Sequence, residues 1–181
     1  ADLKSARFRR PGKDLSFDFA DGKLGGWTPI GTSGWKAADG ALKVEPSPSG
    51  GDMILLGPTF EGEFTLEVRN TCAPERNTQL SGLYTSGAGL FTQCEAEGFR
   101  RITYFLDRPD VMCVYTVTLR AARAAYPVLL SNGNLVEEGE LDGGRHFAKW
   151  HDPHPKPSYL FALVAADLVA REQKIRSRSG G

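Results

Sequence analysis

The sequence predicts an all-β protein, built as an antiparallel β-sandwich or a saddle-like open sheet with little helix. Short apolar runs recur along the chain, and 21 glycines and 11 prolines in 181 residues separate them at short intervals. In the clearest run, residues 112–119, Val114 and Thr116 alternate with Tyr115 and Val117, which suits a strand with one face turned inward. Many short strands joined by turns are typical of sandwiches and open antiparallel sheets.

Strands are expected wherever a short apolar or β-branched run lies between turn residues. In chain order they are 15–19, 41–44, 53–56, 64–69, 101–106, 112–119, 128–130, 134–137, 145–150 and 159–165. One segment, 166–176, contains the helix formers Ala, Glu, Gln and Lys, although its apolar stripe is poor and a final strand is the alternative.

Two turns are marked by their residue types. Asn132-Gly133 lies between two expected strands and predicts a hairpin, because Asn and Gly accept the positive φ angles of a type I′ turn. The run Asp142-Gly143-Gly144 predicts another turn of this kind. By contrast, Gly87-Ala88-Gly89 has no following Lys and no strand-to-helix context, so a phosphate-binding loop is not expected there.

The composition changes near residues 58–62. A section rich in Gly, Ser and Pro comes before this point, and charged residues become more frequent after it. The sequence therefore predicts two parts, a β segment of uncertain affiliation over residues 1–61 and a β domain over 62–181, or else one continuous domain over 1–181.

Charge and hydropathy argue against two classes of partner. The 22 basic and 22 acidic residues balance, whereas nucleic-acid binding needs a concentrated basic excess. The basic residues from Lys4 to Lys13 are expected to lie on a frayed, solvated end of the chain. No apolar run approaches the roughly 20 residues of a membrane-spanning helix, and the first residues do not resemble a signal peptide. Neither nucleic acid nor a membrane is expected as a partner.

The three cysteines indicate a compartment. Cys72, Cys94 and Cys113 are widely spaced and show neither metal-ligand spacing nor a disulfide framework, so a reducing cytoplasm is expected. Cys94 has no His close in sequence to activate it, and a small, half-buried side chain is the expected role.

The stretch 92–110 is the most informative part of the chain, because carboxylates, an amide and arginines flank a short apolar segment. Gln93 and Glu95 are two residues apart, so their side chains point to the same side of an extended segment. A fixed carboxylate with a neutral acceptor beside it suits a positively charged amine in a cleft. The alternative is a solvated face, where charged residues usually lie.

Other polar residues are expected to have structural roles. Exposed Arg–carboxylate pairs can fix loop geometry, although each contributes only about 0–1 kcal/mol. This expectation covers Glu97, Arg100, Arg101, Asp107, Arg108 and Asp110. The run His151-Asp152-Pro153-His154 is expected to be a surface loop rather than a metal site, since no third ligand is evident in the sequence.

Four phrases of the sequence resemble one known family. They are 77–84 (Asn-Thr-Gln-Leu-Ser-Gly-Leu-Tyr), 93–110, 126–134 and 152–165. From about residue 64 to 180, the chain resembles the N-terminal β domain of the bacterial aminopeptidase N family, the zinc-dependent alanyl aminopeptidases. The resemblance implies that the domain packs against a catalytic domain and closes one wall of the substrate pocket. It also implies that Glu95 helps to hold the free α-ammonium of a peptide and that Gln93 lines the pocket beside it.

Two motifs of this family, one of them its zinc-binding helix, are absent from the sequence. There is no Gly-Ala-Met-Glu-Asn motif and no His-Glu-x-x-His helix, and the histidines are His146, His151 and His154. A zinc peptidase needs three protein ligands and a general base. The sequence therefore predicts no catalytic residue, no metal site and no cofactor in this chain, with zinc expected in a missing catalytic domain. That domain and a peptide N-terminus are the expected partners, and the chain alone is expected to be inactive.

Residues 14–60 depart from the family pattern. Their short Gly, Trp and Asp phrases resemble the opening strands of concanavalin-like or laminin-G-like sandwiches, and Trp27 and Trp35 could stack on a sugar. The alternatives are therefore a carbohydrate-binding or structural β-sandwich module, or a truncated or fused product without activity. Packing in the core or at its rim is the competing role for the two tryptophans.

Overall fold

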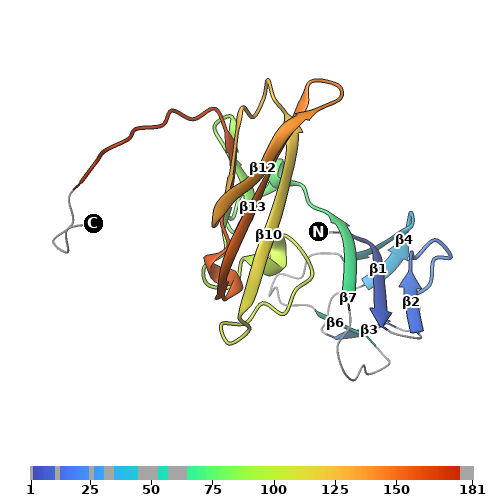
Figure 1. The fold of residues 1–181 in the computed structure, drawn as a ribbon. Helices are drawn as coiled ribbons and strands as arrows, with labels where there is room; N and C mark the ends of the chain where they lie inside the picture. The colour runs from blue at the N-terminus through green and yellow to red at the C-terminus, as the bar shows by residue number, and fades with distance from the viewer. Residues whose placement is uncertain are drawn as a thin grey trace.

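The structure is a computed structural model that describes residues 2–10, 13–24, 27–30, 35–44, 53–56 and 65–175. These residues form antiparallel sheets and three short 3-10 turns (Figure 1). The expected all-β fold with little helix is therefore confirmed. No helix among the described residues is long and apolar enough to cross a membrane.

The elements follow one another along the chain without a long helix between them. The strands are β1 Asp2–Arg10, β2 Lys13–Phe17, β3 Trp27–Ile30, β4 Trp35–Ala38, β5 Ala41–Val44, β6 Met53–Leu56, β7 Thr65–Thr71, β8 Gly82–Ser86, β9 Gly89–Gln93, β10 Cys113–Ala122, β11 Val128–Ser131, β12 Asn134–Leu141, β13 Arg145–Lys156 and β14 Leu163–Ala166. The 3-10 turns are η1 Pro74–Arg76, η2 Phe99–Arg101 and η3 Ser158–Leu160.

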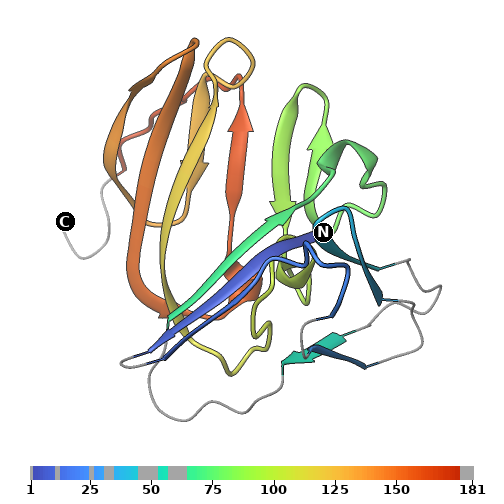
Figure 2. The same ribbon diagram turned by 90° about the vertical axis from the view of Figure 1, so that its right-hand side faces the viewer.

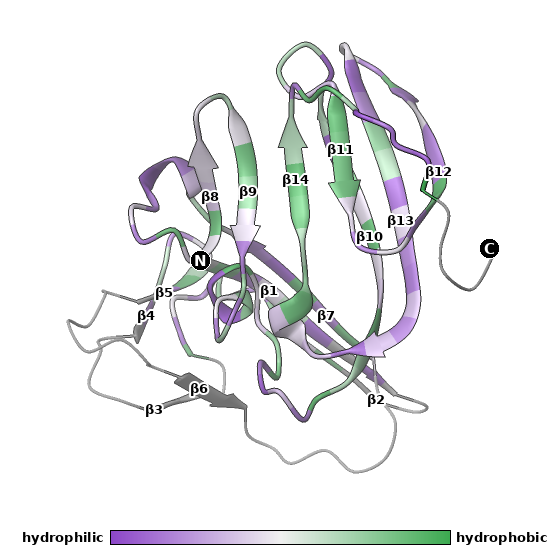
Figure 3. Ribbon diagram, turned by 90° about the vertical axis from the view of Figure 1, so that its left-hand side faces the viewer, coloured by the Kyte–Doolittle hydropathy of each residue, from purple (hydrophilic) through white to green (hydrophobic). Residues whose placement is uncertain are grey.

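Two sheets form the larger half of the molecule. One has the strand order β11-β14-β9-β8 and the other β10-β13-β12. Figure 3 shows them as a curved series of strands running from β8 on one side to β12 on the other. Leu129, Ala148 and Ala165, from β11, β13 and β14, form a buried apolar cluster that both sheets share.

A third sheet lies beside this half (Figure 2). It has the order β2-β1-β5-β4, and β7 also pairs with β1. The expectation of a frayed N-terminus is wrong, because Leu3 and Ala6 of β1 are almost fully buried. The strand pairing shifts register between Leu3 and Ser5, so the side chains of Leu3 and Ala6 both lie on the inner face. Arg7, on the exposed side, hydrogen-bonds Ser16. Arg7 and Arg9 are on the solvated side of this strand.

Residues from both sequence parts meet in one core cluster. Its buried members are Leu3, Phe19 and Leu42, and Val68 and Tyr104 pack against them. The division at residue 62 stays a prediction, and the composition change at 58–62 lies outside the described residues.

Two expected local structures are wrong, and several strands were missed. Residues 101–106 do not form a strand; η2 ends at Arg101 and an irregular segment follows. The expected helix over 166–176 is absent from its described part, since Ala166 ends β14 and residues 167–175 are irregular and exposed. Five strands were not expected, namely β1, β3, β4, β8 and β9. Of these, β8 and β9 form a hairpin whose turn contains the positive-φ Gly87.

The Asn132-Gly133 turn does not form the predicted hairpin. β11 pairs with β14 and β12 pairs with β13, so this turn carries the chain from one sheet to the other. The turn at 142–144 does close the β12–β13 hairpin, with positive φ at Gly143 and Gly144. The Asn-Gly pair thus marked the bend between β11 and β12 correctly, but it did not predict that these two strands pair with other strands and not with each other.

Candidate functional site

The candidate site is the turn that follows β9. Gln93 is the last residue of β9, Glu95 to Gly98 form the turn, and η2 begins at Phe99. Gln93 and Glu95 are exposed, whereas Cys94 between them is 2% exposed and lies in the core. Both predicted site residues are therefore open to solvent, Gln93 at the end of the strand and Glu95 in the turn.

The polar atoms of the pair are arranged as acceptors. Gln93 Nε2 donates to the backbone oxygen of Glu95 at 3.3 Å, which leaves the amide oxygen of Gln93 as an acceptor. Among the residues that the structure describes, the Glu95 carboxylate has no hydrogen-bond or ion-pair partner. An unpaired carboxylate beside an amide oxygen can accept hydrogen bonds from an ammonium group.

A close backbone approach holds the turn together. The Gly98 N–H donates to the Cys94 oxygen at 2.8 Å. A Cβ at Gly98 would lie 2.3 Å from the Gln93 oxygen, 2.8 Å from Cys94 Cα and 3.0 Å from the nitrogen of Gly82 in β8. The turn therefore has no room for a side chain at this position.

The downstream end of the turn is held by Asp107, whose carboxylate is nearly buried at 6% exposure. Asp107 Oδ2 accepts from the Arg100 backbone N–H at 2.9 Å and from Arg100 Nε at 3.1 Å, and Arg100 Nη2 donates to the Asp107 backbone oxygen at 2.7 Å. The Ser158 hydroxyl donates to the other carboxylate oxygen. Burial by itself raises the pKa of Asp107, but the hydrogen bonds from Ser158 and Arg100 outweigh it and hold the pKa below its usual range.

The prediction of structural ion pairs in this stretch is confirmed. Besides the Arg100–Asp107 pair, Arg108 Nη2 lies 2.5 Å from Asp110 Oδ2, and Arg101 donates to the side chain of Gln79. The buried Asp107–Ser158 contact was not predicted. The two residues are 51 positions apart, and no local pattern connects them.

An aromatic cluster lies under the turn. Cys94, Phe99, Tyr115 and Phe161 are its buried members, and the ring centroids of Phe99 and Phe161 are 4.9 Å apart. Cys94 is 2% exposed, which is more buried than expected. This burial raises the pKa of its thiol to about 11, so the thiol is not activated.

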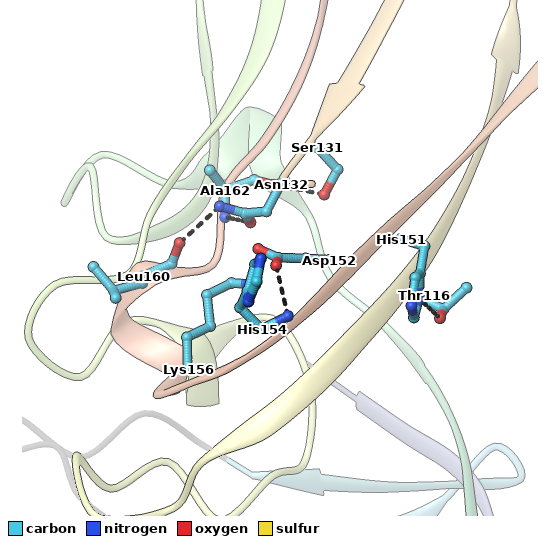
Figure 4. Close-up of polar contacts among 9 residues, drawn as sticks. All are labelled: Thr116, Ser131, Asn132, His151, Asp152, His154, Lys156, Leu160 and Ala162. Carbon is cyan, nitrogen blue, oxygen red and sulfur yellow. Dashed lines mark hydrogen bonds and ion pairs between the residues drawn. The ribbon is translucent and has the colours of Figure 1, made fainter. Parts of the chain in front are cut away.

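The run 151–154 belongs to β13, so the expectation of a surface loop is wrong. Figure 4 shows His151 turned toward Thr116, with Nδ1 2.9 Å from Oγ1, and away from Asp152 and His154. Asp152 accepts from the His154 backbone N–H at 3.1 Å and pairs with Lys156 at 2.5 Å. Within the described parts of the chain, no three His, Cys, Asp or Glu side chains gather closely enough to bind a metal ion. Zinc therefore does not fit these residues.

Trp27, in β3, packs against the core cluster of Leu3, Phe19 and Leu42. Its ring meets Phe17 and Phe19 edge to face, with centroids 5.6 and 6.2 Å apart, against the Leu3 cluster. This arrangement favours the packing role over a sugar-stacking platform. The side chain of Trp35 lies outside the described residues.

Comparisons with known proteins identify the family of the chain. The model of the Peptidase M1 N-terminal domain matches residues 54–160. Aminopeptidase N of Escherichia coli strain K12 is 49% identical over 146 residues, covering 81% of this chain, and aminopeptidase N of Haemophilus influenzae is 55% identical over 118 residues, covering 65%. A crystal structure of Legionella pneumophila aminopeptidase A in complex with aspartic acid matches 99% of this chain, with a TM-score of 0.72 and 32% identity.

These matches define a domain of a peptidase rather than a whole one. The chain spans 15% of the Escherichia coli protein, 14% of the Haemophilus influenzae protein and 18% of the Legionella chain. The chain belongs to the Peptidase M1 N-terminal domain family.

Proposed function

We propose that this chain is the non-catalytic N-terminal domain of a zinc aminopeptidase, and that Glu95 and Gln93 bind the free α-ammonium of peptide substrates. The observation that carries the proposal is the exposed Glu95 carboxylate, which has no partner among the described residues, on a turn whose backbone oxygen accepts from the Gln93 side chain. An ammonium has three donors and no acceptor, so two neighbouring acceptors complement it. The aspartic acid named with the Legionella structure carries such an amine.

A second domain would complete the site. Two hollows of the chain are lined by residues elsewhere, one of about 110 Å³ beside Ser131 and one of about 350 Å³ beside Arg69, and neither is lined by Gln93 or Glu95. The pair lies on an exposed turn, and a cleft would form where a catalytic domain packs against it. The described residues do not suit zinc, so the metal and the hydrolytic chemistry would belong to that domain.

We infer further that residues 1–61 and 62–181 act as one unit. The pairing of β1 with β7 and the packing of Tyr104 on the Leu3 cluster support this proposal. The free thiols of Cys72, Cys94 and Cys113 support a reducing, cytoplasmic location.

The direct test is a chimera in which this chain replaces the matching region of the Escherichia coli relative. Hydrolysis of a fluorogenic alanyl amide then gives KM and kcat separately. Glu95→Gln keeps the shape of the side chain and removes its charge. Because hydrogen bonds between charged groups contribute about 1.5–3 kcal/mol, KM should rise roughly 10- to 100-fold.

Glu138→Gln is the matched control, since Glu138 is also exposed but lies on β12. It should leave KM within twofold of the parent chimera. An unchanged KM in Glu95→Gln would contradict the proposed amine contact. The isolated chain, assayed with added zinc, should release no alanine, and measurable zinc-dependent release would contradict the non-catalytic assignment.

A further inference from the structure

The Glu95 turn is anchored at both ends to one later segment of the chain. Upstream, the Thr92 side chain bonds Leu163 twice: it accepts from the Leu163 N–H at 2.8 Å and lies 3.3 Å from the Leu163 oxygen. Downstream, Arg100 is held by Asp107, which accepts from the Ser158 hydroxyl. Both anchors therefore reach the segment from η3 to the start of β14.

These contacts close a ring through the structure. From Gln93 the chain passes through the turn to η2, then by hydrogen bonds through Asp107 to Ser158 in η3, and along the chain to β14. β14 pairs with β9, with Val164 opposite Phe91, and so returns to the strand that carries Gln93. Because the ring is closed, the loss of one of its contacts should loosen the turn that carries Glu95.

The Asp107 network, which consists of Arg100, Asp107 and Ser158, is the polar part of this ring. Asp107 is 6% exposed and Ser158 1%, so water cannot readily replace a lost partner. Arg100 also extends toward the turn itself, with Nη1 3.8 Å from Glu97 Oε2. That outer pair is exposed and weak, which leaves the buried carboxylate as the main anchor.

We propose that Asp107 is a positioning residue that holds the Glu95 carboxylate beside Gln93 by tying η2 to η3. Asp107 does not touch the substrate; its effect on amine binding passes through the Glu95 turn and rests on the function proposed above. Loss of the network should let the turn open while the two sheets stay folded.

Cys94 reports such an opening directly, because it lies between Gln93 and Glu95 and its thiol is buried. In a Cys72→Ser, Cys113→Ser background, Cys94 is the single thiol of the chain. Its reaction with a disulfide reagent such as dithionitrobenzoate then measures how often the turn opens. Ser158→Ala should raise this rate about tenfold and Asp107→Ala up to about 100-fold, as expected for a buried charged group that loses partners.

Leu129→Ala separates local opening from general destabilisation. Leu129 is buried in the cluster shared by the two sheets and makes no contact with the network. The Leu129→Ala substitution should lower the denaturant midpoint at least as much as Ser158→Ala does. The reaction of Cys94 with the disulfide reagent should nevertheless stay slow in this variant. Equal Cys94 rates in these two variants, or an unchanged rate in Ser158→Ala, would overturn the proposal; Ser158→Ala keeps the test decisive if Asp107→Ala fails to fold.

The chimera distinguishes this proposal from the function on which it rests. Ser158→Ala should raise KM for the alanyl amide several-fold and leave kcat unchanged, whereas a merely structural role would lower the amount of active enzyme without changing KM. If Glu95→Gln raises KM and Ser158→Ala does not, the positioning role is wrong and the proposed function stands. If Glu95→Gln has no effect, the proposed function fails, and the Cys94 rates still decide whether the network holds the turn.

Discussion

Gly98→Ala should destabilise the protein strongly, although the backbone angles at this residue suit alanine. Gly98 has φ −84° and ψ −21°, which any residue adopts. The obstacle is space, since an added Cβ would lie 2.3 Å from the Gln93 oxygen, about 1 Å inside an ordinary contact of 3.4–4 Å. The three nearest atoms all belong to the backbone, so no flexible side chain can move aside. Overpacking typically costs about 1–3 kcal/mol, and we expect about 3 kcal/mol here.

Gly139 and Gly87 serve as control positions for the Gly98→Ala substitution. At Gly139 an added Cβ would meet the Phe147 ring at 2.9 Å, and a side chain can shift. At Gly87 nothing lies within 4 Å, but φ is +57°, so alanine costs only the backbone strain of about 1–2 kcal/mol. Both substitutions should therefore be milder than Gly98→Ala.

Thermal unfolding of each variant, followed by circular dichroism, compares the loss of stability in Gly98→Ala, Gly139→Ala and Gly87→Ala. In a protein of this size, 1 kcal/mol corresponds to about 2–4 °C, so Gly98→Ala should lower Tm by about 6–12 °C. A fall in Tm no larger than that of Gly139→Ala would refute the argument from backbone contact. The same variant should also raise the reactivity of Cys94, because the Gln93 oxygen must move away from the turn.

Three further predictions concern stability and reactivity. The pKa of Asp107 is lower in the folded than in the unfolded chain. Its contribution to stability is therefore present above about pH 4 and is lost as the pH falls through the folded pKa. Urea titrations at several pH values should show this loss of stability in acid, and the loss should be smaller in Asp107→Asn. Asn132→Ala removes hydrogen bonds to two backbone groups, at 2.6 and 3.0 Å, and should lower the free energy of unfolding by about 1–3 kcal/mol in urea titrations, whereas Asn134→Ala at an exposed position should change it by less than about 0.5 kcal/mol. At pH 8, mass spectrometry should find Cys72 alkylated well before Cys94, because Cys72 is exposed and burial raises the Cys94 pKa to about 11; equal rates would contradict this order.

Regular alternation made much of the fold predictable. The strands expected at 41–44 and 53–56 agree with β5 and β6, and that at 112–119 lies mostly within β10. The apolar run 101–106 misled the prediction, because its apolar side chains pack in two different directions. Ile102 packs on the Cys94 cluster and Tyr104 on the Leu3 cluster, so the backbone bends between them instead of continuing as a strand.

The two candidate site residues could be chosen from the sequence, whereas the contacts that support their turn could not. Gln93 and Glu95 were singled out by residue type, spacing and resemblance, and the structure places both on the exposed side. Ser158 could not have been found, since its contact with Asp107 depends on how η3 meets η2. Gly98 gave no signal of its own, because its φ is ordinary and its constraint comes from the opposing backbone.

The place of β14 in its sheet sets an order for synthesis. β14 lies between β11 and β9, and Thr92 in β9 bonds Leu163 across 71 residues of sequence. At about 5–20 residues per second, a ribosome needs about 4–14 s to add that length after the β8–β9 hairpin is made. During this interval β9 has one unpaired edge, and such edges invite pairing with other chains. The turn that carries Glu95 is thus translated early, whereas its anchors at Ser158 and Leu163 become available only after this later segment is made.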